Sequence, residues 1–116
     1  MQEFTVEVVP IQDKDTVVFK PKGSVDSVAA PLLENRFNEA IRNGHYRIIV
    51  DLSKTDFISS AGLGLLLGSV ATLRDNGGDL ILMKIPKDIA DTFELLSVED
   101  YFRTIDSLDE LAATQT

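Results

Sequence analysis

Two short aliphatic runs on either side of a helical pattern restrict the fold more than any other feature of the chain. The runs are RIIVDL at 47–52 and LILMKI at 80–85, and each is typical of a strand buried on both faces of a sheet. Between them, apolar residues recur every three or four positions until a Gly-Gly pair at 77–78. A strand, a helix and a second strand form a βαβ unit. We therefore expect two parallel strands joined by a right-handed crossover, with 47–52 at the centre of the sheet.

The N-terminal part adds a hairpin and a helix. Polar and apolar side chains alternate over 3–9 and 16–22, with 11–15 as the turn between them, which predicts two antiparallel strands. Pro21 is expected at a strand end or edge, because proline has no N–H to donate. The segment 27–44 then carries apolar residues at helical spacing and ends at a glycine, which predicts an amphipathic helix.

The C-terminal part adds two helices and a short strand. Apolar residues at 89, 93 and 96 share one helical face, and 101–105 is predicted to be a short last strand. Ser107 is followed three residues later by Glu110, the pattern of a capping box at the start of a last helix. The final residues, 113–116, are expected to be a frayed tail.

Length, composition and charge limit the class of protein. A chain of 116 residues is enough for one domain, which we expect to span 1–116 as an α/β fold with a mixed sheet of four to five strands and helices mainly on one face. The chain has no cysteine and one histidine, so we expect no metal and no other cofactor. A net charge of -8 repels phosphate backbones and anionic lipid, so we expect no nucleic-acid and no membrane partner. The longest apolar run, 61–73, is too short to cross a bilayer, which favours a soluble cytoplasmic protein.

The stretch FISSAGLGLLLG at 57–68 is the strongest candidate for a functional site. Ser59 and Ser60 stand where an N-cap is wanted at the start of the central helix. Capping alone explains the pair, but a phosphate on a first-turn serine would also be stabilised by the free N–H groups of the helix. Its charge would then act on a partner that docks beside the helix. Both interpretations stay open at this point.

The same helix has an unusual outward face. A rotation of about 100° per residue puts Leu63, Leu66, Leu67, Val70 and Leu73 on one side. The opposite side then carries Gly64, Leu65, Gly68, Ala71 and Thr72. Glycine inside a helix costs about 1 kcal/mol against alanine, so these glycines either are tolerated or serve a docking surface with an exposed leucine in its middle.

The segment VDLSKTDFISSAGLGLLLG resembles the signature of STAS domains, and in particular of free-standing bacterial anti-sigma factor antagonists. The resemblance covers essentially the whole chain, because the expected order of elements is that of the family. It makes Ser60 the phosphoacceptor, with Ser59 as the alternative, since Ser59 stands where many phosphorylated members have Asp. KGSVDSVAAPLL resembles the turn into the family's first helix and puts Asp26 near the acceptor. The candidate partner-binding residues are Asp26, Ser59, Ser60, Gly62, Gly64, Leu65, Gly68, Ser69 and Thr72.

The resemblance implies a partner switch rather than an enzyme. The unphosphorylated protein would bind an anti-sigma factor that is also a serine kinase, and so free a sigma factor for transcription. Phosphorylation of Ser60 by that kinase would end the complex, and a metal-dependent serine phosphatase would reset it. The chain itself would supply only a hydroxyl acceptor and a docking face, and it is expected to be a monomer when free.

Other functions fit the residues less well. The three glycines of GLGLLLG have the wrong last interval for a dinucleotide-binding loop, and neither serine lies in a G-x-S-x-G elbow. A phosphoaspartate receiver would use Asp51, but the acidic pair it needs after the first strand is missing. A STAS subunit that works as an unmodified scaffold beside a transporter or in a signalling assembly is the second alternative. We expect Asp51, Asp56 and Asp75 to be ordinary solvated or loop carboxylates.

Overall fold

The computed structural model describes residues 4–11 and 15–113. Residue 3 of the expected first strand, most of the expected turn at 11–15 and the tail residues 114–116 lie outside the described residues. The strands are β1 (Thr5–Pro10), β2 (Thr16–Val25), β3 (Arg47–Asp51), β4 (Thr55–Ile58), β5 (Asp79–Met83) and β6 (Arg103–Ile105). The helices are α1 (Ala29–Arg42), α2 (Ser60–Asp75), α3 (Lys87–Leu95), the 3-10 turn η1 (Glu99–Tyr101) and α4 (Leu108–Ala113).

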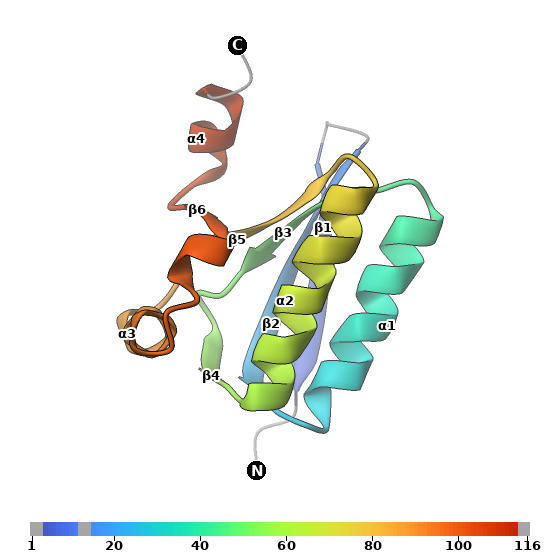
Figure 1. Cartoon of the computed structure of the whole chain (residues 1–116). Helices are drawn as coiled ribbons and strands as arrows, with labels where there is room; N and C mark the ends of the chain where they lie inside the picture. Colours follow the sequence, from blue (N-terminus) through green and yellow to red (C-terminus); the bar gives the residue numbers. More distant parts are fainter. Residues whose placement is uncertain (1–3, 12–14, 114–116) are drawn as a thin grey trace.

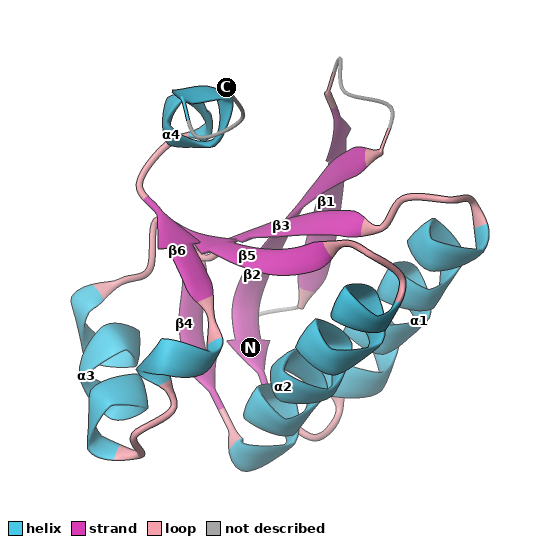
Figure 2. Ribbon diagram, turned by 45° about the horizontal axis from the view of Figure 1, so that its top comes forward, coloured by secondary structure: helices cyan, strands magenta, loops and turns pink. Residues whose placement is uncertain are grey.

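The strands form one mixed sheet in the order β1-β2-β3-β5-β6 (Figure 2). β1 and β2 are antiparallel, and every other neighbouring pair is parallel. The α/β class, the hairpin and the parallel β3 and β5 joined through α2 are confirmed, with β3 in the middle of the sheet. The described residues form six strands, not the four to five expected. The additional strand is β4, which lies off this path, pairs with the end of β2 and is too short to show a period in the sequence.

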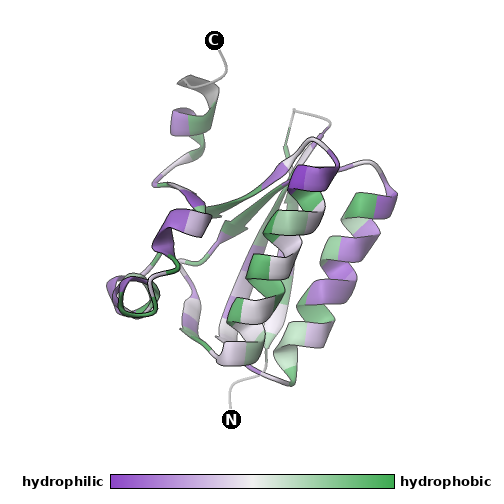
Figure 3. Cartoon of the chain, viewed as in Figure 1, coloured by the Kyte–Doolittle hydropathy of each residue, from purple (hydrophilic) through white to green (hydrophobic). Residues whose placement is uncertain are grey.

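Helices α1 and α2 lie side by side on one face of the sheet (Figures 1 and 2). Their buried side chains, with Ile89 and Phe93 of α3, form one core with the strand residues that point to this face. The opposite face has a smaller core, to which α4 contributes Leu111. The prediction that helices lie mainly on one face is therefore confirmed. Figure 3 shows the resulting pattern, with β3 and β5 coloured as apolar and the outer side of α1 as polar.

The sequence predicted Pro21 at a strand end or edge. The residue lies inside β2 and pairs with Val6, so it does not end its strand, but it has a strand neighbour on one side only. The reason is a change of neighbour along β2. Its first part, 16–19, pairs with β3, and its last part, 23–25, pairs with β4. Pro21 falls in the gap between these two ladders, where no N–H is required on that side. Its carbonyl oxygen accepts a hydrogen bond from Oγ1 of Thr55, at 2.9 Å, where β4 begins.

The start of α4 follows the predicted capping pattern. The Glu110 carboxylate accepts hydrogen bonds from the backbone N–H of Ser107, at 3.0 Å, and from that of Asp106. These bonds satisfy N–H groups that a short helix leaves without partners in its first turn. Sequence spacing was therefore sufficient to locate this helix end.

The placement of the main core predicts a large difference between two substitutions in α1. Phe37 is 1% exposed, and its ring meets that of Phe19 edge to face with centroids 5.2 Å apart. Leu32 on the same helix is 52% exposed. We expect Phe37→Ala to lower the free energy of unfolding by about 3–5 kcal/mol, and Leu32→Ala by less than about 1 kcal/mol. Urea denaturation measures both, and similar losses would contradict this core.

Candidate functional site

The site is built where β2 ends and α2 begins. Ser59 has extended backbone geometry and is the N-cap residue of α2. Its Oγ accepts a hydrogen bond from the backbone N–H of Gly62 at 3.3 Å. The same hydroxyl donates to the carbonyl oxygen of Val25 at 3.2 Å, and the backbone N–H of Ser59 donates to that oxygen at 3.0 Å. Ser59 is half-buried, and its hydroxyl is fully used in joining β2 to the helix.

Ser60 is the first residue of α2, and its surroundings differ from those of Ser59. It is exposed, and its hydroxyl makes no hydrogen bond with any described residue. The sequence left open which serine caps the helix. The structure assigns the cap to Ser59 and leaves the hydroxyl of Ser60 accessible beside the N–H groups of the first turn.

The glycines of α2 fall into two kinds. Gly62 is buried, and a Cβ placed on it would lie 2.4 Å from the carbonyl oxygen of Val25. The missing side chain of Gly62 therefore lets the helix approach the end of β2 closely. Gly62 was predicted to belong to the partner-binding surface, but it is not exposed there. Gly64 and Gly68 are exposed, and a Cβ on either would meet nothing within 4 Å. These two glycines face outward, as expected.

The prediction that Leu65 stands bare on the outward face is wrong. Leu65 is half-buried and packs against the main core, as Leu63 and Leu67 also do. On a helix Leu65 lies about 160° around the axis from Leu63, so these leucines flank the buried stripe on opposite sides. The physical reason is that α1 packs along one side of α2. Leu65 is therefore partly covered, although it would be exposed on an isolated helix.

The other predicted residues of α2 lie along its second half. Ser69 is half-buried. Thr72 is exposed, and its Oγ1 donates to the carbonyl oxygen of Gly68 at 3.1 Å, so this hydroxyl is used within the helix. The outward strip of α2 therefore consists of Gly64, Gly68 and Thr72, together with the exposed Ala61 and Ala71.

Asp26 lies at the turn from β2 into α1, next to Val25. Its Oδ1 accepts hydrogen bonds from the backbone N–H groups of Val28, at 3.0 Å, and Ala29, at 2.9 Å. The carboxylate thus satisfies two N–H groups at the turn into α1, whose N-cap residue, Val28, has no side-chain capping bond of its own. α1 and α2 begin at the same end of the molecule (Figure 1), and Val25, the residue before Asp26, is hydrogen-bonded to Ser59. That Asp26 takes part in partner binding stays a prediction.

An apolar groove beside Ser60 was not foreseen from the sequence. It has a volume of about 460 Å³ and runs between α2, β4 and α3. Its walls include Ser60, Leu63 and Leu67, with Phe57 and Leu96 opening onto solvent at 55% and 53% exposure. Leu96 shares the helical spacing of Ile89 and Phe93, but it follows the end of α3 and is exposed, whereas those two are buried. The sequence did contain one sign of this groove. Successive side chains of a strand point to opposite faces, so Phe57 and Ile58 of β4 cannot both point into the core.

The acidic residues considered as alternatives give no phosphoaspartate or metal site. Asp56 and Asp75 are exposed, as expected. Asp51, expected to be solvated, is instead 2% exposed, and its Oδ1 accepts from the backbone N–H of Ser53 at 2.9 Å. This bond holds the turn from β3 into β4. Over 4–11 and 15–113, no cluster of three or more His, Cys, Asp or Glu residues is arranged to hold a metal ion.

Known proteins resemble this chain in sequence and in fold. The profile of the STAS domain matches residues 7–111. Over 92 residues, 79% of each chain, the sequence is 32% identical to BtrV of Bordetella bronchiseptica, provisionally named an anti-sigma factor antagonist. Over 89 residues, 77% of this chain and 82% of the relative, it is 30% identical to the anti-sigma-B factor antagonist of Staphylococcus aureus.

Solved structures give the same result. The unphosphorylated anti-sigma factor antagonist SpoIIAA superposes with a TM-score of 0.71 at 25% identity, covering 97% of this chain and 96% of the other. An anti-sigma factor antagonist from Mycobacterium paratuberculosis has the same fold, with a TM-score of 0.82 at 23% identity over 98% and 96% of the two chains.

These features define the class of protein. The chain is an α/β domain with a mixed sheet, a hairpin and a serine-capped helix beside the end of β2, and it has the fold of solved anti-sigma factor antagonists. The match over most of the sequence makes the assignment specific, and the chain belongs to the STAS domain family. In the described part of the chain, every helix is too short or too polar to cross a membrane.

The two kinds of glycine predict opposite effects of the same substitution. We expect Gly62→Ala to destabilise the fold by about 1–3 kcal/mol, because the new Cβ overlaps the Val25 carbonyl oxygen. Gly64→Ala, two residues on in open space, should stabilise it by up to about 1 kcal/mol through helix propensity. Thermal unfolding of the two variants checks this, and equal shifts would contradict the close approach at Gly62.

Proposed function

We propose that this chain is an anti-sigma factor antagonist whose release from its partner is controlled by phosphorylation of Ser60. The names of its sequence relatives and of its structural neighbour SpoIIAA support the first part of the proposal. The observation that carries the second part is the contrast between the two serines. Ser59 has both of its hydroxyl interactions satisfied, whereas Ser60 is exposed with a free hydroxyl at the start of α2.

Phosphorylation of Ser60 is compatible with an intact fold. A phosphate on Ser59 would remove the proton that its hydroxyl donates to the Val25 carbonyl oxygen and so break that bond, whereas one on Ser60 breaks none. A negative group at the first turn of a helix is stabilised by about 0.3–1 kcal/mol through the helix dipole and the free N–H groups. The modification is therefore expected to change the surface and to leave the stability of the domain nearly unchanged.

Release follows from what surrounds Ser60. The groove beside it is mainly apolar, and the strip of Gly64 and Gly68 lets another backbone come close to α2. A phosphate adds a charge of about -1.5 to -2 and a tightly held hydration shell at the edge of this surface. Covering that charge with a partner costs several kcal/mol unless the partner pairs it. The unphosphorylated form is then the binding form.

The chemical groups for phosphoryl transfer come from the partner in this proposal. Oγ of Ser60 attacks the γ-phosphorus of ATP held by an anti-sigma factor serine kinase, the bond to ADP breaks, and the hydroxyl proton passes to a base of the kinase. A metal-dependent serine phosphatase would hydrolyse the phosphoserine and restore the binding form. Because sigma factors act on RNA polymerase, this exchange would take place in the cytoplasm, with the free chain as a monomer.

A charge at Ser60 tests the switch. We expect Ser60→Asp to weaken binding to the cognate anti-sigma factor by about tenfold or more, since it puts a carboxylate beside the apolar groove. The melting temperature should change by no more than about 2 °C. The binding partner is found by testing the purified anti-sigma factor kinases of the source organism one by one in titration calorimetry.

Asn38→Asp is the matched control, because it adds the same charge on the exposed outer side of α1. Binding by this variant should be unchanged. If Ser60→Asp binds as tightly as the parent chain, the phosphorylation switch is excluded and the unmodified scaffold is the better account. A collapse of thermal stability would make Ser60 a structural residue.

The groove supplies a separate test of the docking surface. Phe57→Ala and Leu96→Ala should each weaken anti-sigma factor binding by roughly tenfold, because both remove apolar area from the groove walls. Leu95→Ala is the control: this neighbour is 83% exposed and lies outside the groove. Equal binding by all three variants in the same calorimetric assay would move the docking surface away from the groove.

A further inference from the structure

A second groove lies on the other side of α3. It has a volume of about 500 Å³ and is bounded by α3, η1 and β6. The residues that line it are Ile85, Ala90, Phe93, Glu94, Glu99, Asp100, Phe102 and Thr104. Its position and its chemistry differ from those of the groove beside Ser60, whose rim carries hydroxyl and apolar groups.

The floor of this acidic groove is apolar and aromatic. Phe93 and Phe102 stack with their ring centroids 5.5 Å apart and an angle of 25° between the ring planes. Both rings are nearly buried, and Ile85 and Ala90 extend the floor beside them. A floor of this kind favours an occupant with an aliphatic or planar group over a hydrated ion.

The rim of the acidic groove carries three carboxylates. Glu94, Glu99 and Asp100 are exposed, and none of them forms an ion pair or a side-chain hydrogen bond with another described residue. Three like charges around one groove repel one another, so a cation placed among them gains from all three. The rim is therefore complementary to a positive charge.

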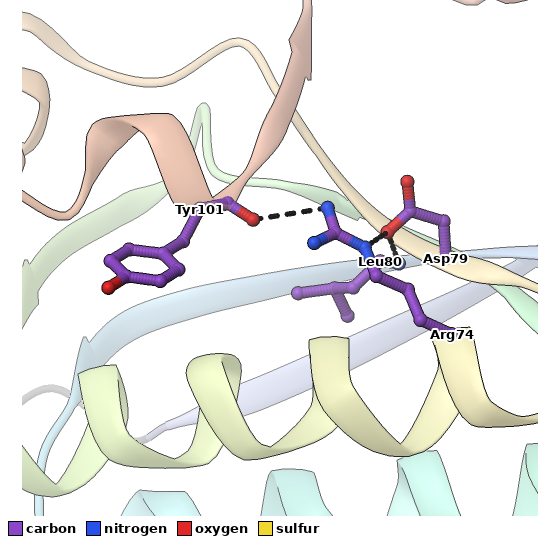
Figure 4. Close-up of polar contacts among 4 residues, drawn as sticks. All are labelled: Arg74, Asp79, Leu80 and Tyr101. Atoms are coloured by element: carbon purple, nitrogen blue, oxygen red, sulfur yellow. Dashed lines mark hydrogen bonds and ion pairs between the residues drawn. The ribbon is translucent and has the colours of Figure 1, made fainter.

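Arg74 lies close to this rim without neutralising it. Its Nε donates to Oδ1 of Asp79 at 3.0 Å, and its Nη2 donates to the carbonyl oxygen of Tyr101 at 3.1 Å (Figure 4). The guanidinium is thus used to fix the end of η1, the segment that carries Glu99 and Asp100. This contact fixes the backbone of the segment from which two of the three carboxylates project.

We propose that the acidic groove docks an arginine-bearing apolar segment of a second protein partner. The aliphatic stem of an arginine suits the apolar floor at Ile85 and Ala90, above the buried Phe93–Phe102 pair, and the charge suits the three carboxylates of the rim. A bare metal ion would leave the floor unused, and the described residues include no metal-holding cluster. The occupant is therefore a protein segment.

This docking does not depend on the phosphorylation state of Ser60. Thr92 and Leu96 line the groove beside Ser60, while Ala90 and Glu94 line the acidic groove. α3 therefore lies between the two surfaces, whose lining residues have only the buried Phe93 in common. A second partner can then stay bound while the anti-sigma factor is bound or released. The chain would act as an adaptor as well as a switch.

The test uses the full chain and a short fluorescein-labelled peptide with two arginines around a leucine, followed by fluorescence anisotropy. Replacing both arginines by citrulline, their neutral analogue, should weaken binding by about tenfold or more. The triple variant Glu94→Gln, Glu99→Gln, Asp100→Asn should show a similar loss. The matched triple Glu34→Gln, Glu39→Gln, Asp75→Asn changes the net charge equally at exposed sites elsewhere and should lose less than about twofold.

Equal losses in the two triple variants would mean attraction by overall charge and would overturn the proposal. Amide shifts in NMR spectra of the parent chain give an independent answer. Shifts at Ala90, Glu94 and Thr104, which line only the acidic groove, support docking there, and shifts confined to Ser60 and Leu63 overturn it. Ser60→Asp should bind the peptide within about twofold of the parent chain. Neither measurement needs a kinase or a phosphate, so a failure here leaves the proposed switch standing.

Discussion

The carbonyl oxygen of Val25 is the point on which the functional end of this domain depends. It accepts two hydrogen bonds from Ser59, one from the backbone and one from the side chain. The absence of a side chain on Gly62 lets α2 come within reach of it. Each bond contributes about 1 kcal/mol net, and together they fix where α2 starts. The pairing of Val25 with Ile58 fixes the same place from the side of β4. The position of Ser60 is therefore set by contacts of Val25, Ile58 and Ser59, and the side chain of Ser60 takes part in none of them.

This arrangement separates two tasks that one serine could not combine well. The residue that caps α2 must keep its hydroxyl aimed at the backbone, whereas a phosphoacceptor must present its hydroxyl to another protein. Ser59 has the first task, and the geometry leaves Ser60 free for the second. A phosphate at the first turn is mildly stabilising by the helix dipole, while the same charge at the edge of an apolar groove opposes docking by several kcal/mol. In the proposed switch, a phosphate on Ser60 would thus change the free energy of binding more than the free energy of unfolding, and the fold would survive a modification that ends a complex.

The sequence was sufficient for the parts of the fold that repeat over many residues, and insufficient where single residues respond to distant neighbours. The βαβ unit and the hairpin follow from periodicity alone. β4 is four residues long with one apolar residue on each side, which is too short for a period to be visible. Leu65 has the sequence position of an exposed residue, but α1 covers that flank. Pro21 was predicted at a strand end or edge, and its place inside β2 was missed, because the switch of β2 from β3 to β4 cannot be seen locally. The serine pair was found, but which serine caps the helix required the position of Val25.

The central claim is that Ser60, and not Ser59, receives the phosphate. Peptide mapping by mass spectrometry, after incubation of the chain with ATP and the anti-sigma factor kinase that binds it, tests this most directly. The account predicts a single phosphate on Ser60, its loss in Ser60→Ala, and its retention in Ser59→Thr, which keeps a capping hydroxyl. A phosphate on Ser59 in the parent chain, or none with the kinase that binds the chain most tightly, would contradict it.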